Sequence, residues 1–322
     1  MNDFQKQLHL INNYVSENLG SNSLAELYDP VSYAMSQKGK RLRPILTLLG
    51  CELFGTNPEN ALPAAHAIEL LHNSTLVHDD IMDEADIRRG QPSVIKKFGL
   101  NSAVLSGDVM IFQSYNELTK QENRHQPALL SVLSNSIIEV CEGQQLDMNF
   151  EKTPKIKIAD YLDMIEKKTA ALLGCSLQLG AIIGDASNDD AELVNRFGRN
   201  IGKAFQIQDD LLDVYGDQAV FGKKIGGDII QNKKTFLLVK AFEKADAKQQ
   251  KEIEKWLKSN DETAKINGIV TIYDELKIRN EAEKMMAVYQ DKSLINLNFI
   301  DVEDELKAPL RQLAQSLLVR QN

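Results

Sequence analysis

The sequence predicts an all-α fold, and three observations support that prediction. The chain has eight prolines, and none lies between Pro154 and Pro309. Because proline breaks helices, such an interval leaves room for long ones. Apolar residues within it recur at helical spacing in "YLDMIEKKTAALLGCSLQLGAIIG", where Leu162, Ile165 and Leu172 share a face. Dense β-branched alternation, which would indicate strands, is absent. We therefore expect a mostly helical chain with short connections.

The length of 322 residues would allow about two domains. No Pro/Gly/Ser-rich linker or compositional break divides the chain, so we predict one domain spanning residues 1–322. The segment 214–234 has four glycines and four lysines and is expected to be a mobile loop. The charge-rich run 244–265 is expected to be a solvated helix face.

Charge and cysteine usage narrow the functional classes. A net charge of −9 argues against nucleic-acid binding. Cys51, Cys141 and Cys175 lie far apart without a CxxC pair, which suits the reducing cytosol and gives no zinc or disulfide framework. The first residues are polar, unlike a signal peptide, and no apolar run reaches membrane-spanning length. We expect a cytoplasmic protein with no integral membrane segment.

Two segments repeat the pattern Asp-Asp-x-x-Asp, in "HDDIMD" and "QDDLLD". Residues three and four apart share a helix face, so each motif projects carboxylates in one direction. Aspartate is a mediocre helix former and like charges repel, so a cation is expected among them. The alternative is two solvated helix ends. The predicted metal ligands are Asp79, Asp80, Asp83, Asp209, Asp210 and Asp213.

The type of ligand indicates the metal. Carboxylates without Cys or His partners favour the hard cations Mg²⁺ and Mn²⁺. The calcium-loop spacing is missing. Mg²⁺ takes one or two carboxylates together with substrate phosphates, so we expect about three Mg²⁺ ions clamping a diphosphate, with Mn²⁺ as a substitute.

Four short basic clusters accompany the acidic motifs. Each alone is typical of a protein surface, but together in an acidic protein they indicate a site for more than one diphosphate. Arginine forks suit a diphosphate that is held without metal. The clusters are Lys40, Arg41 and Arg43; Arg88 and Arg89; Lys168, followed by Thr169; and Lys223, Lys224, Lys233 and Lys234.

With these residues the sequence resembles the all-trans polyprenyl diphosphate synthase family. "GKRLRP", "HDDIMDEADIRRG", "GQQLD", "KTAALL", "FQIQDDLLD" and "GKKIGGDI…KKT" appear in the family's order, from about residue 30 to about residue 240. The resemblance implies an isoprenoid synthase-like fold, a single large bundle of antiparallel helices around a deep central cavity, normally as a homodimer. It also implies condensation of isopentenyl diphosphate with an allylic prenyl diphosphate, which releases diphosphate.

The resemblance also assigns roles by position. The first three aspartates would bind Mg²⁺ on the allylic diphosphate, and the second three another Mg²⁺ on its far side. Arg88 would reach the allylic diphosphate. The isopentenyl diphosphate would be held by Lys40, Arg43, His72 and Arg89. The groups around the developing cation or the phosphates would be Lys168, Thr169, Gln206, Lys223, Lys224 and Lys233.

Some positions stay open or depart from the family. Lys223 and Lys224 compete for the place of one phosphate-binding lysine. Asn232 stands where many bacterial members have glycine. His72 could instead be an ordinary buried histidine. The other two histidines of this region, His66 and His78, are expected to be structural or to support the site indirectly.

Product length is expected to depend on the helix that precedes the first motif. Ser74 and Thr75 lie about one turn before Asp79, and a turn rises about 5.4 Å, close to one isoprene unit. Both are small, so the tail is expected to pass them and meet Leu71 one turn further. The resemblance therefore implies products of geranylgeranyl length or longer. Other candidate walls are Ile137, Ile138, Cys141, Phe112 and Phe150.

Two alternative functions fit the sequence less well. A class I terpene cyclase has a different second metal motif and no isopentenyl site, so the second Asp-Asp-x-x-Asp and "GKRLRP" count against it. A non-catalytic subunit of a heteromeric synthase typically loses Asp triads, and both are intact here. A membrane prenyltransferase is excluded by the lack of spans.

Overall fold

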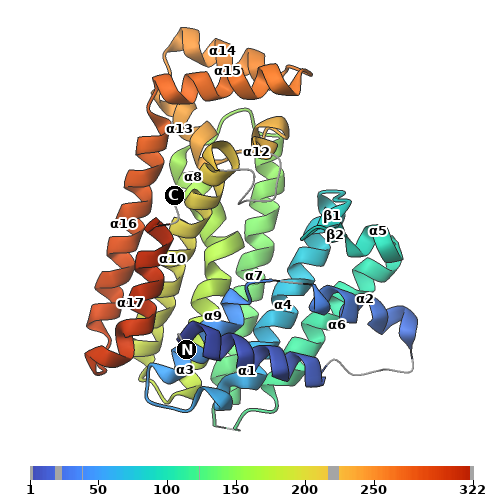
Figure 1. Cartoon of the computed structure of the whole chain (residues 1–322), viewed down its shortest axis with the longest axis vertical. Coiled ribbons are helices and arrows are strands. Elements are labelled where there is room, and N and C mark those ends of the chain that lie inside the picture. Colours follow the sequence, from blue (N-terminus) through green and yellow to red (C-terminus); the bar gives the residue numbers. More distant parts are fainter. Residues whose placement is uncertain (1–2, 19–23, 38, 123, 217–224, 320–322) are drawn as a thin grey trace. The chain divides into compact units, whose positions relative to one another are not determined.

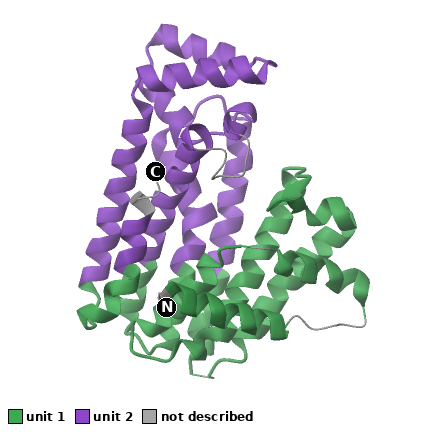
Figure 2. Ribbon diagram, in the orientation of Figure 1, with its two compact units in different colours: residues 1–134, 175–195, 299–310 green, residues 135–174, 196–298, 311–322 purple. Residues whose placement is uncertain are grey.

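The computed structural model describes residues 3–18, 24–37, 39–122, 124–216 and 225–319 (Figure 1). These residues are mainly helical and contain one two-stranded hairpin, so the prediction of an all-α fold is confirmed. The chain divides into two compact units (Figure 2). Unit 1 comprises residues 1–134, 175–195 and 299–310, and unit 2 comprises residues 135–174, 196–298 and 311–322. The single domain that we expected stays a prediction.

The elements fall into three groups. Those wholly in unit 1 are α1 (Asp3–Asn18), α2 (Ala25–Ser36), α3 (Leu42–Glu52), the short 3₁₀ helix Pro58–Ala61, α4 (Leu62–Met82), β1 (Ile87–Arg88), β2 (Gln91–Pro92), α5 (Val94–Phe98) and α6 (Leu100–Leu118). Those wholly in unit 2 are α8 (Ile158–Ile165), a π-helical turn (Glu166–Ala170), α12 (Gly227–Ile230), α13 (Phe236–Lys244), α14 (Ala247–Leu257) and α15 (Glu262–Glu275). The boundaries between the units fall within α7 (Gln126–Glu151), α9 (Ala171–Ile183), α10 (Asn188–Tyr215), α16 (Ile278–Phe299) and α17 (Asp304–Val319).

Helix α4 is the central element of unit 1. It packs against α3 and α6 and is buried over much of its length. Pro63 stands in its first turn, where the missing N–H costs nothing. At Gly107 of α6 a Cβ atom would collide with the ring of His78, so α6 approaches the end of α4 closely. The helix ends at Met82, and Glu84 then adopts a positive φ of 49°.

A β-hairpin that was not predicted follows α4. Ile87 pairs with Pro92 and Arg88 with Gln91. The turn residues Arg89 and Gly90 both have positive φ, 52° and 75°, which is the signature of a type I′ turn. This tight turn fixes both arginines of "IRRGQP" directly after the first aspartate motif.

Unit 2 has its own apolar core, formed around Tyr161, Phe236 and Tyr273. Helices α14 and α15 lie side by side in it (Figure 1). The run 244–265 extends from the last residue of α13 through α14 to the start of α15. Most of its residues are exposed, as expected, but Ala245, Ile253 and Lys265 are buried. Lys265 Nζ donates to the carbonyl of Ile230 at 2.9 Å.

The expected mobile loop 214–234 is only partly described. Val214 and Tyr215 end α10, and the short helix α12 lies further along. Lys223 and Lys224 lie outside the described residues. None of the described helices combines the length and apolarity that a membrane crossing requires.

Candidate active site

The first acidic cluster, Asp79, Asp80 and Asp83, lies at the C-terminal end of α4. Asp79 and Asp80 belong to the last turn, and the N–H of Asp83 donates to the carbonyl of Asp79 at 2.8 Å. The free carbonyls at a helix C-terminus carry partial negative charge and disfavour carboxylates. Three acids at this end therefore need a cation to offset them. Asp80 is buried, whereas Asp79 is partly exposed and Asp83 exposed.

Arg88 of the hairpin supplies one such cation. Its Nε and Nη2 donate to Asp80 Oδ1 at 2.9 and 2.5 Å, and Nη2 lies 3.9 Å from Asp79 Oδ2. Burial raises the pKa of Asp80, and the hydrogen bonds from Arg88 oppose that rise. Asp80 is thus held by the protein, while its two neighbours are more accessible to solvent.

A second candidate site in unit 1 contains Arg43, His72 and Arg89, and the exposed Lys40 lies close to Arg43 in sequence; these four residues are called the cationic cluster. Arg43 Nη1 lies 3.2 Å from His72 Nε2. Burial lowers the pKa of His72 well below its usual value, and the neighbouring arginines lower it further, so His72 is neutral. Burial also lowers the pKa of Arg43, to about 10. The guanidinium of Arg89 lies against Gly39, 3.0 Å from where a Cβ would stand. Mutual repulsion of these cations would be relieved by an anion.

The second acidic cluster lies on α10 and is built around a buried carboxylate. Asp210 Oδ2 accepts hydrogen bonds from Tyr161 Oη at 2.7 Å and from the N–H of Phe236 at 2.8 Å. Its Oδ1 accepts from Gln206 Nε2 at 3.2 Å. Burial and the charge of Asp228 raise the pKa of Asp210 to about 7, against the effect of these donors. Asp210, like Asp80, is engaged by the protein.

A fourth carboxylate, Asp228, completes this cluster with Asp209, Asp210 and Asp213. The N–H of Asp228 donates to Asp213 Oδ2 at 3.1 Å, so Asp213 holds the start of α12. Asp228 was missed at the sequence level. Its signal was an aspartate directly after the glycine pair of "IGGDI".

Lys168 is oriented by a residue to which the sequence alone assigned no role. Its Nζ donates to Asp147 Oδ2 at 2.6 Å, and Asp147 is the last residue of "GQQLD". The first residue of that motif, Gly143, lies against the backbone of the π-helical turn, where a Cβ would collide with Lys168 N. In this motif Gly143 therefore lets the backbone of α7 approach the π-helical turn, and Asp147, one turn later, binds Lys168.

Thr169 and Gln206 also lie together in unit 2. Thr169 Oγ1 donates to Gln206 Oε1 at 3.0 Å. The two helices approach closely because Gly202 faces Ala170, and a Cβ at Gly202 would lie only 2.6 Å from the Ala170 Cα. Hydrogen bonds thus run from Thr169 through Gln206 to Asp210.

The lysines after α12 follow a constrained turn. Asn232 has a φ of 58°, a conformation that glycine and asparagine tolerate best. Asparagine therefore fits this position as glycine would. The N–H of Lys233 donates to the carbonyl of Asp228 at 3.0 Å, and burial lowers the pKa of Lys234.

The candidate chain-length residues are small or buried on α4. Ser74 is fully buried and donates to the carbonyl of Leu71 at 2.7 Å. Thr75 donates to the carbonyl of His72 at 2.8 Å. Their role in product length stays a prediction. Of the other candidate walls, Ile137 and Phe150 are partly buried, and the exposed ones are Phe112, Ile138 and Cys141.

The two histidines expected to be structural or supporting both lie against α6. His66 is buried near Glu117, with Nδ1 3.5 Å from Oε2. His78 Nε2 lies 3.4 Å from the carbonyl of Val104.

The acidic clusters fit a metal that arrives with its substrate. Within the described ranges, no group of three or more His, Cys, Asp or Glu side chains is arranged to hold a metal ion by itself. Mg²⁺ commonly takes one or two protein carboxylates and completes its octahedron with water and phosphate oxygens. The carboxylates that could serve as such Mg²⁺ ligands are Asp79 and Asp83 in the first acidic cluster and Asp209 in the second.

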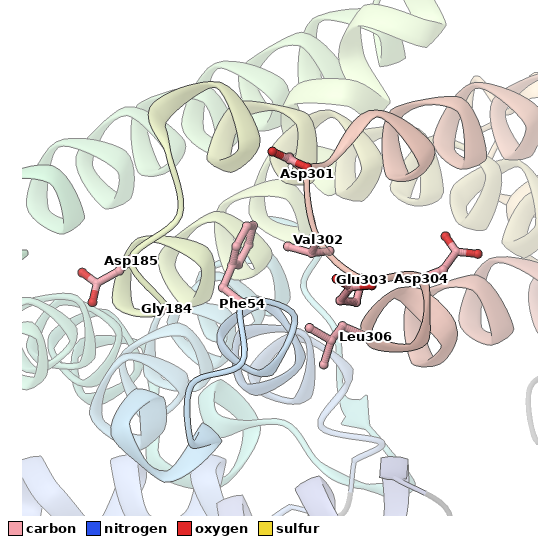
Figure 3. A pocket seen from close by; sticks show the side chains of 8 residues that line it. All are labelled: Phe54, Gly184, Asp185, Asp301, Val302, Glu303, Asp304 and Leu306. Carbon is pink, nitrogen blue, oxygen red and sulfur yellow. The ribbon is translucent and has the colours of Figure 1, made fainter.

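Unit 1 also carries an open pocket of about 660 Å³ (Figure 3). It contains none of the predicted site residues. Its lining is Phe54, Gly184, Asp185, Asp301, Val302, Glu303, Asp304 and Leu306.

Comparison with known proteins identifies the family. The polyprenyl synthetase family model matches residues 24–275. The chain belongs to the polyprenyl synthetase family. The resemblance seen in the sequence is thereby confirmed. This polyprenyl synthetase is a prenyltransferase that elongates all-trans prenyl chains. Members of the family depend on a divalent metal.

The relatives of this polyprenyl synthetase include enzymes named for their products. It is 36% identical to the geranylgeranyl diphosphate synthase of Sulfolobus acidocaldarius over 99% of this chain and 98% of that protein. It is 45% identical to the one of Methanosarcina mazei over 68% of each. A crystal structure of a geranylgeranyl pyrophosphate synthase matches it with a TM-score of 0.95 and 36% identity over the full length of both chains.

Proposed function

We propose that this polyprenyl synthetase condenses isopentenyl diphosphate with an allylic prenyl diphosphate by using the two clusters of unit 1 for different diphosphates. The observation that carries the proposal is their chemical contrast. The first acidic cluster offers carboxylates of the kind that bind Mg²⁺. The cationic cluster offers guanidinium and ammonium groups that bind an anion directly. An enzyme that ionises a single substrate, such as a terpene cyclase, would need only the first.

The allylic diphosphate belongs to the first acidic cluster in this proposal. Asp79 and Asp83 would hold Mg²⁺ on this diphosphate, and Arg88 contacts the same phosphates. Asp80 takes part mainly by orienting Arg88, since its carboxylate already accepts two hydrogen bonds from that guanidinium.

The second acidic cluster, in unit 2, is also proposed to bind Mg²⁺ and diphosphate. Asp209 and Asp213 would hold further Mg²⁺, and we add Asp228 to these two ligands. About three ions would be bound in all, with Mn²⁺ as a substitute. Asp210 supports them through its hydrogen bonds to Tyr161 and Phe236. Lys233, with Lys223 or Lys224, contacts the phosphates.

The isopentenyl diphosphate belongs to the cationic cluster. Lys40, Arg43 and Arg89 supply positive charge without a metal. Because His72 is neutral, it accepts a hydrogen bond from Arg43 and does not add to the repulsion among the cations.

The proposed reaction first forms an allylic carbocation and diphosphate, and isopentenyl diphosphate then reacts with the carbocation. The allylic C–O bond breaks with its electron pair on the diphosphate. Mg²⁺ held by the carboxylates would neutralise the charge that develops there. Thr169, Gln206 and the backbone near Lys168 present oxygen dipoles to the cation. The isopentenyl double bond attacks C1 of the cation, and the adduct then loses a proton to the released diphosphate.

The product is proposed to be of geranylgeranyl length or longer. Ser74 is small, and the relatives include geranylgeranyl diphosphate synthases and the geranylfarnesyl diphosphate synthase of Natronomonas pharaonis. We further propose a cytoplasmic homodimer in which both units form one synthase domain. The dispersed cysteines support the location, and an exposed apolar face on α6 supports the dimer.

The direct test is a product assay. The protein is incubated with radiolabelled isopentenyl diphosphate, Mg²⁺ and each allylic primer in turn, and the products are sized. Label should enter prenyl diphosphates only when a primer is present, EDTA should abolish incorporation, and Mg²⁺ should restore it. Conversion of the primer alone into hydrocarbon would indicate a cyclase, and full activity in EDTA would contradict the metal assignment.

A further inference from the structure

A buried ion pair joins the turn before α3 to the middle of α4. The guanidinium of Arg41 donates to Glu69 Oε1 at 2.5 Å and to the carbonyl of Met35 at 2.7 Å. The two charged side chains are only 9% and 3% exposed. Glu69 Oε1 also accepts from Asn73 Nδ2 at 2.9 Å. One arginine thus ties the end of α2 and the start of α3 to α4.

The backbone of Arg41 needs such support. Its φ of 49° and ψ of 33° lie in the left-handed region, which non-glycine residues adopt at an energetic cost. No side chain caps the N-terminus of α3 in its place. The two hydrogen bonds of the Arg41 guanidinium help to offset this cost, together with the bond from the N–H of Ile45 to the carbonyl of Arg41 at 3.1 Å.

Arg43, His72 and Arg89 of the cationic cluster lie near enough to this pair to feel its charges, and Lys40 is its neighbour in sequence. Lys40 precedes Arg41, and Arg43 follows two positions later. His72, the partner of Arg43, lies three residues after Glu69 on the same face of α4. The guanidinium of Arg41 is already occupied by a carboxylate and a carbonyl, so it is not itself free to bind a phosphate.

The charge of Glu69 also acts on its cationic neighbours. It raises the pKa of Arg43 and that of Arg89, against the lowering caused by burial. The buried carboxylate thereby offsets the repulsion among these cations.

We propose that Arg41 and Glu69 are positioning residues for isopentenyl diphosphate, because their ion pair holds the left-handed turn that directs Lys40 and Arg43 at one diphosphate. The inference rests on the proposed function and deepens it.

The test measures the KM for isopentenyl diphosphate and the KM for the allylic primer in three variants, Arg41→Lys, Arg41→Gln and Glu69→Gln. The KM for isopentenyl diphosphate should rise by about tenfold in Arg41→Gln and Glu69→Gln, the effect of one lost charge-assisted hydrogen bond. Arg41→Lys keeps the charge and should show a smaller rise. The KM for the allylic primer should change by less than about twofold, because the acidic clusters are untouched. Arg124→Gln, which breaks an exposed ion pair with Asp185, is the control and should match the unmodified protein.

A double variant serves as the control for folding, because a single substitution leaves one buried charge without its partner. Arg41→Met/Glu69→Met removes both charges at similar volume and should fold, as judged by circular dichroism, while the KM for isopentenyl diphosphate stays raised. A folded double variant with an unchanged KM would overturn the inference, as would equal rises for both substrates. Failure of the unmodified protein to incorporate any label would instead overturn the proposed function, and this inference with it.

Discussion

At the scale of single residues, Ser74 is the position at which one side chain is expected to set the product. Ser74→Phe places a ring about one turn below the first acidic cluster, where the growing tail is expected to pass. Products should shorten toward farnesyl length, as measured by chromatography of the dephosphorylated alcohols. Ser74→Ala should leave the length unchanged.

Because Ser74 is buried, a larger side chain at this position could also destabilise the fold. Overpacking a core position costs about 1–3 kcal/mol of stability, so circular dichroism must accompany the assay. A folded Ser74→Phe variant that still makes the original products would show that another residue limits the chain.

Tyr161 is a second residue with a separable role. Tyr161→Phe keeps the ring contact with Phe236 but removes the hydroxyl that donates to Asp210. A buried carboxylate that loses one donor costs about 1–3 kcal/mol, so we expect a lower Tm and a kcat reduced by about tenfold. The KM for isopentenyl diphosphate should not change. Unaltered kcat would mean that Asp210 does not need this hydrogen bond to support its neighbours.

At the scale of elements, α7 and the π-helical turn make a close backbone contact at Gly143. Gly143→Ala adds a methyl group where the backbone of Lys168 lies, so one element must move. We expect a loss of kcat of at least about tenfold, because the Lys168–Asp147 and Thr169–Gln206 contacts would be displaced together. Ser131→Ala, an exposed position on the same helix, should behave like the unmodified protein. Equal activities of the two variants would contradict the need for this close approach.

The elements also show where sequence reasoning succeeded and where it stopped. The long helices and both Asp motifs were predictable because their signals are local, in proline placement and in three- and four-residue spacing. The hairpin was missed because an arginine, not an asparagine or glycine, occupies the first left-handed position of its turn. Asp147 and Glu69 were missed because their partners lie 21 and 28 residues away in sequence, and only packing brings them together.

At the scale of the whole molecule, we expect the proposed dimer to form through the exposed apolar side of α6. Leu105 and Phe112 lie seven residues apart on one side of α6 and are 57% and 71% exposed. Exposed apolar groups in a row indicate an association surface. Leu105→Lys/Phe112→Lys should halve the mass measured by analytical ultracentrifugation.

The matched control uses a second exposed apolar pair, on α16. Val288→Lys/Ile295→Lys adds the same charge at the same spacing and should leave the mass unchanged. Dissociation by the α16 variant alone would place the interface there, and a monomeric unmodified protein would remove the dimer from the proposal.

The hairpin after α4 has a consequence for how the two substrates sense each other. Arg88 and Arg89 are consecutive, yet one bonds to the first acidic cluster and the other belongs to the cationic cluster. We expect a ligand that fixes either arginine to fix the shared turn as well, and so to lower the entropy that the other ligand must lose. The two diphosphates are then thermodynamically linked, and each should raise the affinity of the other by the same factor. Titration calorimetry with isopentenyl diphosphate, with and without a non-reactive allylic analogue and Mg²⁺, would measure that factor.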